Sequence, residues 1–226
     1  MESIDAAREI LSEQELRVIG CLIEKERTTP DLYPLTLNAL VNACNQKSNR
    51  SPVVTYAHAD VSRVLDDLRW KGWIVVVDEA GSRAEKYRHR FAEKTGLGEK
   101  EVAVLAELML RGPQTAGELR GRANRMAALA GIEEVQTILS ALEGAEPRRV
   151  VRLSRQTGFK ERRWTHLLAG EPAAADDDAP AERAEEPSGA VRGSARAAGL
   201  EQEIASLRAR VEALEGEIEE LRSRVG

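Results

Sequence analysis

The stretch "YPLTLNALVNACNQKSNRSPV", residues 33–53, gathers amide and cationic side chains that could recognise nucleic acid. Behind an apolar helical pattern come five such residues: Asn45, Gln46, Lys47, Asn49 and Arg50. Amides can pair with adenine, and cations can meet phosphate or guanine. The same residue types also satisfy backbone groups in bends and cap helices. The stretch therefore predicts ligand contact, bend-making, or both. Lys47 and Arg50 are not needed for the shape of a bend, so we expect both to point outward.

Two neighbouring segments offer further candidate contacts. The helix expected after the bend turns His58, Ser62, Arg63, Asp66 and Arg69 outward, and the first three are candidate contacts. The hairpin expected next is basic, with Arg83, Lys86, Arg88, His89 and Arg90, and Arg83, Lys86 and Arg88 are the candidate contacts. In helix-turn-helix proteins the third helix enters the major groove while flanking segments contact phosphate. Residues 55–71 carry three Lys/Arg and three Asp/Glu, which is a poor electrostatic footprint for that role.

The sequence offers little support for catalysis. His58, His89 and His166 lie far apart, and the adjacent Asp66 and Asp67 point in different directions if they lie on a helix. The motifs of zinc hydrolases, serine hydrolases and phosphate-binding loops are absent from the 226 residues. We therefore expect a non-enzymatic protein with no cofactor and no metal site.

These candidates must be positioned by a pattern that occurs twice. The segment "SEQELRVIGCLIEK" (12–25) aligns without gaps with "GEKEVAVLAELMLR" (98–111), and the apolar positions have helical spacing. Each copy continues with a second short helix, over 35–44 and 115–125, and then a third helix and a two-stranded hairpin with glycine near its turn. Ser12 with Glu15 predicts a capping box at the first helix.

Three helices closed by a hairpin is the plan of a winged helix. The predicted fold class is therefore mainly α with small β-hairpins (α+β). We expect winged-helix domains over 1–95 and 96–169, a flexible linker over 170–199 and a coiled-coil helix over 200–226. A second capping box, Thr115 with Glu118, supports the second copy. Trp70 and Trp73 flank the helix–hairpin junction, where core or interdomain packing is favoured over base stacking.

The last 27 residues carry a heptad seam. Its apolar residues are spaced four and three apart: Leu200, Ile204, Leu207, Val211, Leu214, Ile218, Leu221 and Val225. β-branched residues at a and leucine at d favour a parallel two-stranded coil. We therefore expect a homodimer, although the flanking charges also allow an antiparallel pair. The alternative is one amphipathic helix that docks on its own body.

Charge is unevenly distributed along the chain. The net charge is −5, but residues 170–226 hold 7 Lys/Arg against 14 Asp/Glu, so the preceding body is mildly basic. No apolar run approaches the length that crosses a membrane, and the N-terminus lacks a signal-peptide pattern. Cys21 and Cys44 lie in apolar helical patterns and are expected to be buried free thiols. These features favour a cytoplasmic protein without membrane contact.

The asparagine-rich stretch, with "LSEQELRVIGCLIEKE" before it and "VSRVLDDLRWKGWI" after it, resembles the YceH-like family of bacterial proteins. The resemblance covers about residues 11–168, and the heptad tail is also similar to the ending common in that family. It implies a tandem winged-helix body and a cytoplasmic bacterial protein. It implies no catalytic or binding residue, because the family has none assigned.

Two functions follow from these patterns. The first is a homodimeric protein, such as a transcription regulator, that binds double-stranded DNA through the 45–50 bend, the start of the third helix and the first hairpin. The second is an adaptor that uses tandem winged helices to dock a protein partner, since a fold does not fix a function. The acidic third helix of the second copy, with Glu133 and Glu134, favours the adaptor.

Overall fold

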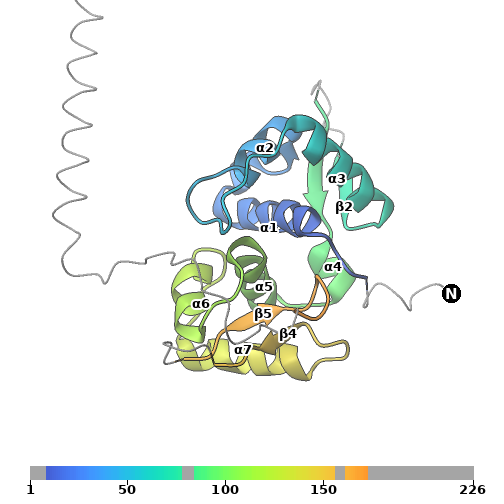
Figure 1. The fold of residues 1–226 in the computed structure, drawn as a ribbon. Helices are drawn as coiled ribbons and strands as arrows, with labels where there is room; N and C mark the ends of the chain where they lie inside the picture. Colours follow the sequence, from blue (N-terminus) through green and yellow to red (C-terminus); the bar gives the residue numbers. More distant parts are fainter. Residues whose placement is uncertain (1–8, 78–83, 156–160, 173–226) are drawn as a thin grey trace, which may run out of the picture. The chain divides into compact units, whose positions relative to one another are not determined.

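The computed structural model describes residues 9–77, 84–155 and 161–172. In the first half of the chain it contains these elements in order: α1 (Glu13–Thr28), a 3-10 turn (Pro30–Leu32), β1 (Leu35–Thr36), α2 (Leu37–Cys44), α3 (His58–Trp70), β2 (Ile74–Val77), β3 (Lys86–His89) and α4 (Phe91–Thr95). In the second half it contains α5 (Glu99–Arg111), α6 (Ala116–Ala123), α7 (Ile132–Gly144), β4 (Val150–Arg152) and β5 (Trp164–His166). Figure 1 shows this arrangement.

About half of the described residues are helical, and two small antiparallel sheets complete the fold. The first sheet has the order β1-β3-β2, in which Ile74 faces His89 and Leu35 faces Tyr87. The second joins β4 to β5 and sets Val150 opposite His166. The predicted combination of helices with small hairpin strands is thus present. Residues 78–83 and 156–160, which lie between the paired strands, are outside the described residues.

Local signals account for most helix ends. Ser12 caps α1 and Thr115 caps α6, and both predicted capping boxes form. Gly72, with φ of 74°, follows α3, in a left-handed conformation that suits glycine. The second helix begins at Leu37 instead of residue 35, because Leu35 and Thr36 pair with β3 and the Thr36 side chain caps α2.

The core is aliphatic, and its centre is the contact between α1 and α5, which lie side by side in Figure 1. Gly20 allows this approach, since a Cβ added there would lie 3.1 Å from the Leu110 side chain. By this packing residues 1–178 make one compact unit, within which the expected boundary after residue 95 falls between α4 and α5. Cys21 and Cys44 are buried free thiols, as predicted.

The two tryptophans at the end of α3 have opposite environments. Trp73 is buried, stacks near Phe91 with ring centroids 5.6 Å apart, and fulfils the prediction of core packing. Trp70 is 88% exposed, so the same prediction is wrong for this residue. The buried face of α3 is formed by Val61, Leu65 and Leu68, and two residues beyond Leu68 the helix has turned away from the core.

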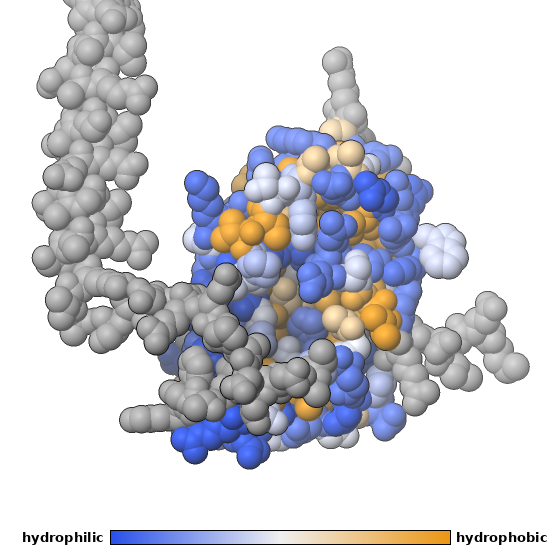
Figure 2. All heavy atoms as spheres, in the orientation of Figure 1, coloured by the Kyte–Doolittle hydropathy of each residue, from blue (hydrophilic) through white to orange (hydrophobic). Residues whose placement is uncertain are grey.

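The surface is mainly hydrophilic. On the face drawn in Figure 2, hydrophobic residues form small separate patches among polar ones. Large exposed apolar side chains are few in the described part of the chain: Ile10, Leu32, Val53, Trp70 and Ile132. In the same part of the chain, every helix is too short or too polar to cross a bilayer.

Candidate nucleic-acid interface and the ionic cluster behind it

The bend between α2 and α3 is held by the side chain of Asn45. Its Nδ2 donates to the backbone oxygen of Tyr56 at 2.9 Å, and its Oδ1 accepts from the backbone N–H of Tyr56 at 2.8 Å. This pair of bonds ties the two ends of the bend together. Asn49 contributes a left-handed φ of 59°, which asparagine tolerates better than most residues. The structure therefore supports the interpretation that the Asn45 side chain shapes the bend.

Arg50 is buried, so the prediction that it points outward is wrong. Its side chain is 0% exposed and forms a two-pronged ion pair with Glu24 of α1, with Nη1 at 3.1 Å from Oε1 and Nη2 at 2.5 Å from Oε2. Its Nε also donates to the backbone oxygen of Ala43. The physical reason is Glu24, which lies on the buried face of α1 and needs a counter-charge. Arg50 therefore fixes the bend from the inside.

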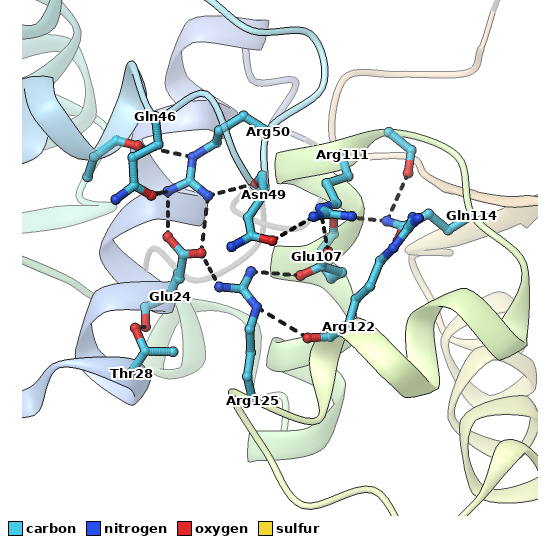
Figure 3. Close-up of polar contacts among 12 residues, drawn as sticks. Glu24, Thr28, Gln46, Asn49, Arg50, Glu107, Arg111, Gln114, Arg122 and Arg125 are labelled. Carbon is cyan, nitrogen blue, oxygen red and sulfur yellow. Dashed lines mark hydrogen bonds and ion pairs between the residues drawn. The ribbon is translucent and has the colours of Figure 1, made fainter. Parts of the chain in front are cut away.

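This ion pair is one end of an ionic cluster shown in Figure 3, which we define by six residues: Glu24, Arg50, Glu107, Arg111, Arg122 and Arg125. Arg125 bridges Glu24 and Glu107, reaching the latter at 3.0 Å. Arg111 pairs with Glu107 at 3.2 Å and donates to Asn49 at 2.6 Å. Arg125 Nε also donates to the backbone oxygen of Arg122 at 3.2 Å. The cluster thus links α1 and the bend to α5, to the end of α6 and to the residue Arg125 after it.

The cluster shifts the ionisation of its members. Burial alone would raise the pKa of Glu24, but the hydrogen bonds and charges of Arg50 and Arg125 outweigh it and lower that pKa. The pKa of Arg125 is raised, because its interactions with Glu24 and Glu107 outweigh the effect of burial. Sequence reasoning missed Glu24, Glu107 and Arg125. The signal that could have found them is a glutamate inside an apolar helical pattern, as in "CLIEK" and "LAELM".

At the surface of the bend, Lys47 and Ser48 are exposed. Lys47 makes no ion pair or side-chain hydrogen bond with any residue that the structure describes. Gln46 turns inward and accepts from Arg50 at 3.0 Å. Of the five polar residues predicted here, the structure thus brings Asn45, Gln46, Asn49 and Arg50 into internal contacts and leaves Lys47 available.

The start of α3 presents the other candidates at the surface. His58 is exposed, and its Nε2 lies 3.1 Å from Oδ1 of Asn38 on α2. The Arg63 side chain is 71% exposed and lies 3.5 Å from Asp60. Ser62 is half-buried beside it. These three residues share the helix end that lies next to α2.

The strand pair β2–β3 is less cationic than its sequence suggests. Arg88 and Arg90 both pair with Glu93, at 2.7 and 2.8 Å. Their hydrogen bonds lower the pKa of Glu93 to about 2. Lys86 is half-buried at the start of β3, and Arg83 lies outside the described residues. Arg88 thus shares the single negative charge of Glu93, on α4, with Arg90.

Two further predictions concern other parts of the chain. The eight heptad residues from Leu200 to Val225 lie outside the described residues, and so does most of the expected linker. Within the described ranges, His, Cys, Asp and Glu form no group of three or more that could hold a metal ion.

Comparison with known proteins identifies the family. Residues 11–159 match the family described as "Protein of unknown function, DUF480". A "UPF0502 protein" of Geotalea uraniireducens (strain Rf4) is 52% identical over 200 residues, covering 88% of this chain and 90% of that protein. A protein of the same description from Solibacter usitatus (strain Ellin6076) is 49% identical over 201 residues, covering 88% and 93%. The predicted resemblance to an uncharacterised bacterial family is confirmed, and the chain belongs to the DUF480 family.

Proposed function

We propose that the protein is a non-enzymatic winged-helix protein that binds double-stranded DNA as a homodimer. Each half of the body has the required order of three helices followed by a strand pair. In the first half, α3 packs one apolar face on the core and leaves His58 and Arg63 exposed at its beginning. A helix placed in this way can approach a groove of a duplex.

The observation that carries this proposal is the position of Lys47. The protein locks the bend with Asn45 on Tyr56 and with Arg50 on Glu24, and holds a lone cation outward on that fixed support. A cation that is not paired internally can neutralise a DNA phosphate and release a counterion. A rigid support reduces the cost of ordering the bend when it binds.

Burial and ion pairs decide which of the candidate DNA contacts the proposal keeps. Lys47, His58, Ser62, Arg63 and Lys86 remain candidates. Arg50 is excluded by burial, and Arg88 is a weaker candidate because it lies 2.7 Å from Glu93. With few cations, the binding is expected to be weak and non-specific unless two bodies act together.

The test is fluorescence anisotropy of the full chain with a random-sequence duplex across a salt series. Each lost phosphate contact reduces the slope of log K against log salt by about 0.9. Lys47→Gln/Arg63→Gln is therefore expected to reduce the slope by roughly 1.8. Arg88→Gln/Arg90→Gln removes the same number of charges from the Glu93 cluster and serves as the matched control. The proposal fails if wild type does not bind at low salt or if the two variants lose the same slope.

Docking of a protein partner is the second candidate function, and Trp70 favours it. An indole that is 88% exposed at the end of a helix is the kind of residue that dominates protein interfaces. The exposed Asp66 and Asp67 on the same helix disfavour contact with phosphate. A photoreactive residue at position 70 should crosslink a discrete protein in cells, whereas the same residue at position 140, on α7, should not. If position 70 crosslinks to a protein and neither position crosslinks to DNA, protein docking is favoured over DNA binding.

A further inference from the structure

A cavity of about 440 Å³ lies beside the strand pair β4–β5, away from the bend. One side is formed by Glu9, Ile10 and Trp73 from the first half of the chain. The other is formed by residues 146–149 before β4 and by residues 167, 168, 170 and 171 after β5. The backbone N–H of Leu11 donates to the oxygen of Leu168 at 2.8 Å and so joins the two sides. The volume is within the range of small-molecule sites in proteins.

Arg149 lines this cavity and is buried without a counter-charge. The residue is 8% exposed, and its backbone is held on both sides, by Leu142 at 2.9 Å and by Leu167 at 2.8 Å. Its guanidinium makes no ion pair or side-chain hydrogen bond with any residue in the described ranges. Burial lowers the pKa of Arg149, and no neighbouring carboxylate opposes that effect.

The carboxylates that share the cavity are engaged elsewhere or exposed. Glu9 accepts from Trp73 Nε1 at 2.8 Å and pairs with Lys94 at 3.1 Å. Glu171 pairs with the exposed Arg148 at 2.9 Å. Glu146 is exposed to solvent. None of the three is therefore a partner of Arg149.

The other buried arginines of the described residues have hydrogen-bond or ion-pair partners for their guanidinium groups. Arg50 pairs with Glu24 and donates to backbone oxygens. Arg17 donates to the backbone oxygen of Pro52 at 2.7 Å and to that of Cys44 at 3.4 Å. A buried charge without such partners is costly to keep. Arg149 lacks such partners, and it lines the cavity.

We propose that this cavity binds a small organic anion, with its carboxylate or phosphate group on Arg149 and its apolar part against Trp73 and Leu168. The planar guanidinium matches either anionic group with two parallel hydrogen bonds. Because the walls come from both halves of the chain, a bound molecule would hold the halves together. The site is separate from the bend and does not depend on the proposed DNA binding.

The occupant to which we commit is a free molecule of metabolite size. The chain itself also carries anions close by in sequence, since Asp176, Asp177 and Asp178 follow the cavity residue Glu171. An internal carboxylate on Arg149 is thus the rival that the experiment must separate from a free ligand.

The experiment is isothermal titration of the full chain with acetate, inorganic phosphate and benzoate, each up to 50 mM, with benzamide as the uncharged match for benzoate. We expect saturable binding of at least one anion and none of benzamide. Arg149→Met should weaken the binding at least tenfold. Arg148→Gln, next to it in sequence but exposed and paired with Glu171, should leave it within twofold of wild type.

Two further results decide the remaining cases. Thermal melting of Arg149→Met without ligand should equal or exceed that of wild type, because the variant loses a buried unpaired charge. A much lower melting temperature would mean that the guanidinium has a structural partner and would overturn the proposal. Failure of wild type to bind any of the three anions would also overturn it. If binding appears only in Asp176→Asn/Asp177→Asn/Asp178→Asn, the occupant is the tail and the proposed free ligand is wrong.

Discussion

At the scale of single residues, the bend 45–57 explains why so many amides and cations follow one another. Asn45 closes the bend on Tyr56, Asn49 takes a left-handed conformation and accepts from Arg111, and Arg50 turns inward to Glu24. Polar side chains thus replace the apolar packing that a short irregular segment lacks. The remaining cation, Lys47, is presented by this support.

The first prediction concerns the burial of Arg50. Arg50→Met should lower the free energy of unfolding by about 3 kcal/mol, because it leaves Glu24 with only Arg125 in a buried setting. Lys47→Met, in the same bend, should change it by less than about 0.5 kcal/mol, since the side chain is exposed. Urea unfolding followed by circular dichroism measures both. Equal effects of the two substitutions would contradict the buried position of Arg50.

The second prediction concerns His166 on β5. Burial lowers its pKa from 6.5 to about 4, and its Nδ1 has no hydrogen-bond partner among the described residues. Between pH 6.5 and about 4 the unfolded chain binds this proton and the folded chain does not, so this residue makes stability fall as pH falls. Urea unfolding of His166→Gln at pH 7.5 and 5 should show a smaller pH dependence than wild type. A pH profile of His166→Gln that runs parallel to that of wild type would refute the assignment.

At the scale of elements, the parts that the sequence predicts are those that depend on near neighbours. The capping boxes of α1 and α6 require residues three apart, and the apolar faces of α1 and α5 follow from helical spacing. The contacts that escaped prediction join distant residues. Arg50 and Glu24 are separated by 26 positions, and nothing in the local pattern says which charge will be buried with which. Trp70 escaped for a related reason, because aromatic residues at a helix end serve both cores and surfaces.

The third prediction tests the close approach of α1 and α5. A Cβ at Gly20 would lie 3.1 Å from the fully buried Leu110, whereas a Cβ at Gly121 in α6 would meet nothing within 4 Å. Alanine in place of glycine normally stabilises a helix by roughly 0.5–1 kcal/mol. Gly121→Ala should show that gain, whereas Gly20→Ala should be destabilising by about 1 kcal/mol, because overpacking outweighs it. Chemical unfolding of both variants is the measurement. A gain in both would mean that the two helices can move apart freely.

At the scale of the whole molecule, the ionic cluster and the cavity both use residues from the two halves of the repeat. The ionic cluster joins Glu24 of α1 to Glu107 of α5 through Arg125. The cavity joins Trp73 to Arg149. The two halves of the repeat therefore form one body, and each half contributes side chains that the other lacks. A pair of such bodies would double every candidate DNA contact, which matters because the proposed interface contains few cations.

The fourth prediction concerns that pairing. The heptad seam predicts that Leu207→Glu/Leu214→Glu converts a dimer into a monomer, because both residues occupy d positions of the coil. Ala209→Glu/Ser223→Glu adds the same two charges at outward positions and should remain dimeric. Sedimentation velocity at several concentrations distinguishes the two. A monomeric wild type, or identical sedimentation of both variants, would contradict the coil and favour a helix docked on its own body.

The same pair of variants connects assembly to DNA binding. If two bodies contact one duplex, the monomeric variant touches about half as many phosphates, and its slope of log K against log salt should be about half that of wild type. Its affinity should fall by much more than twofold, because the second body no longer binds at the high local concentration set by the first. The outward-facing control should match wild type in both respects. An unchanged slope in a confirmed monomer would show that one body makes all the phosphate contacts, and the heptad tail would then need a role other than pairing DNA-binding surfaces.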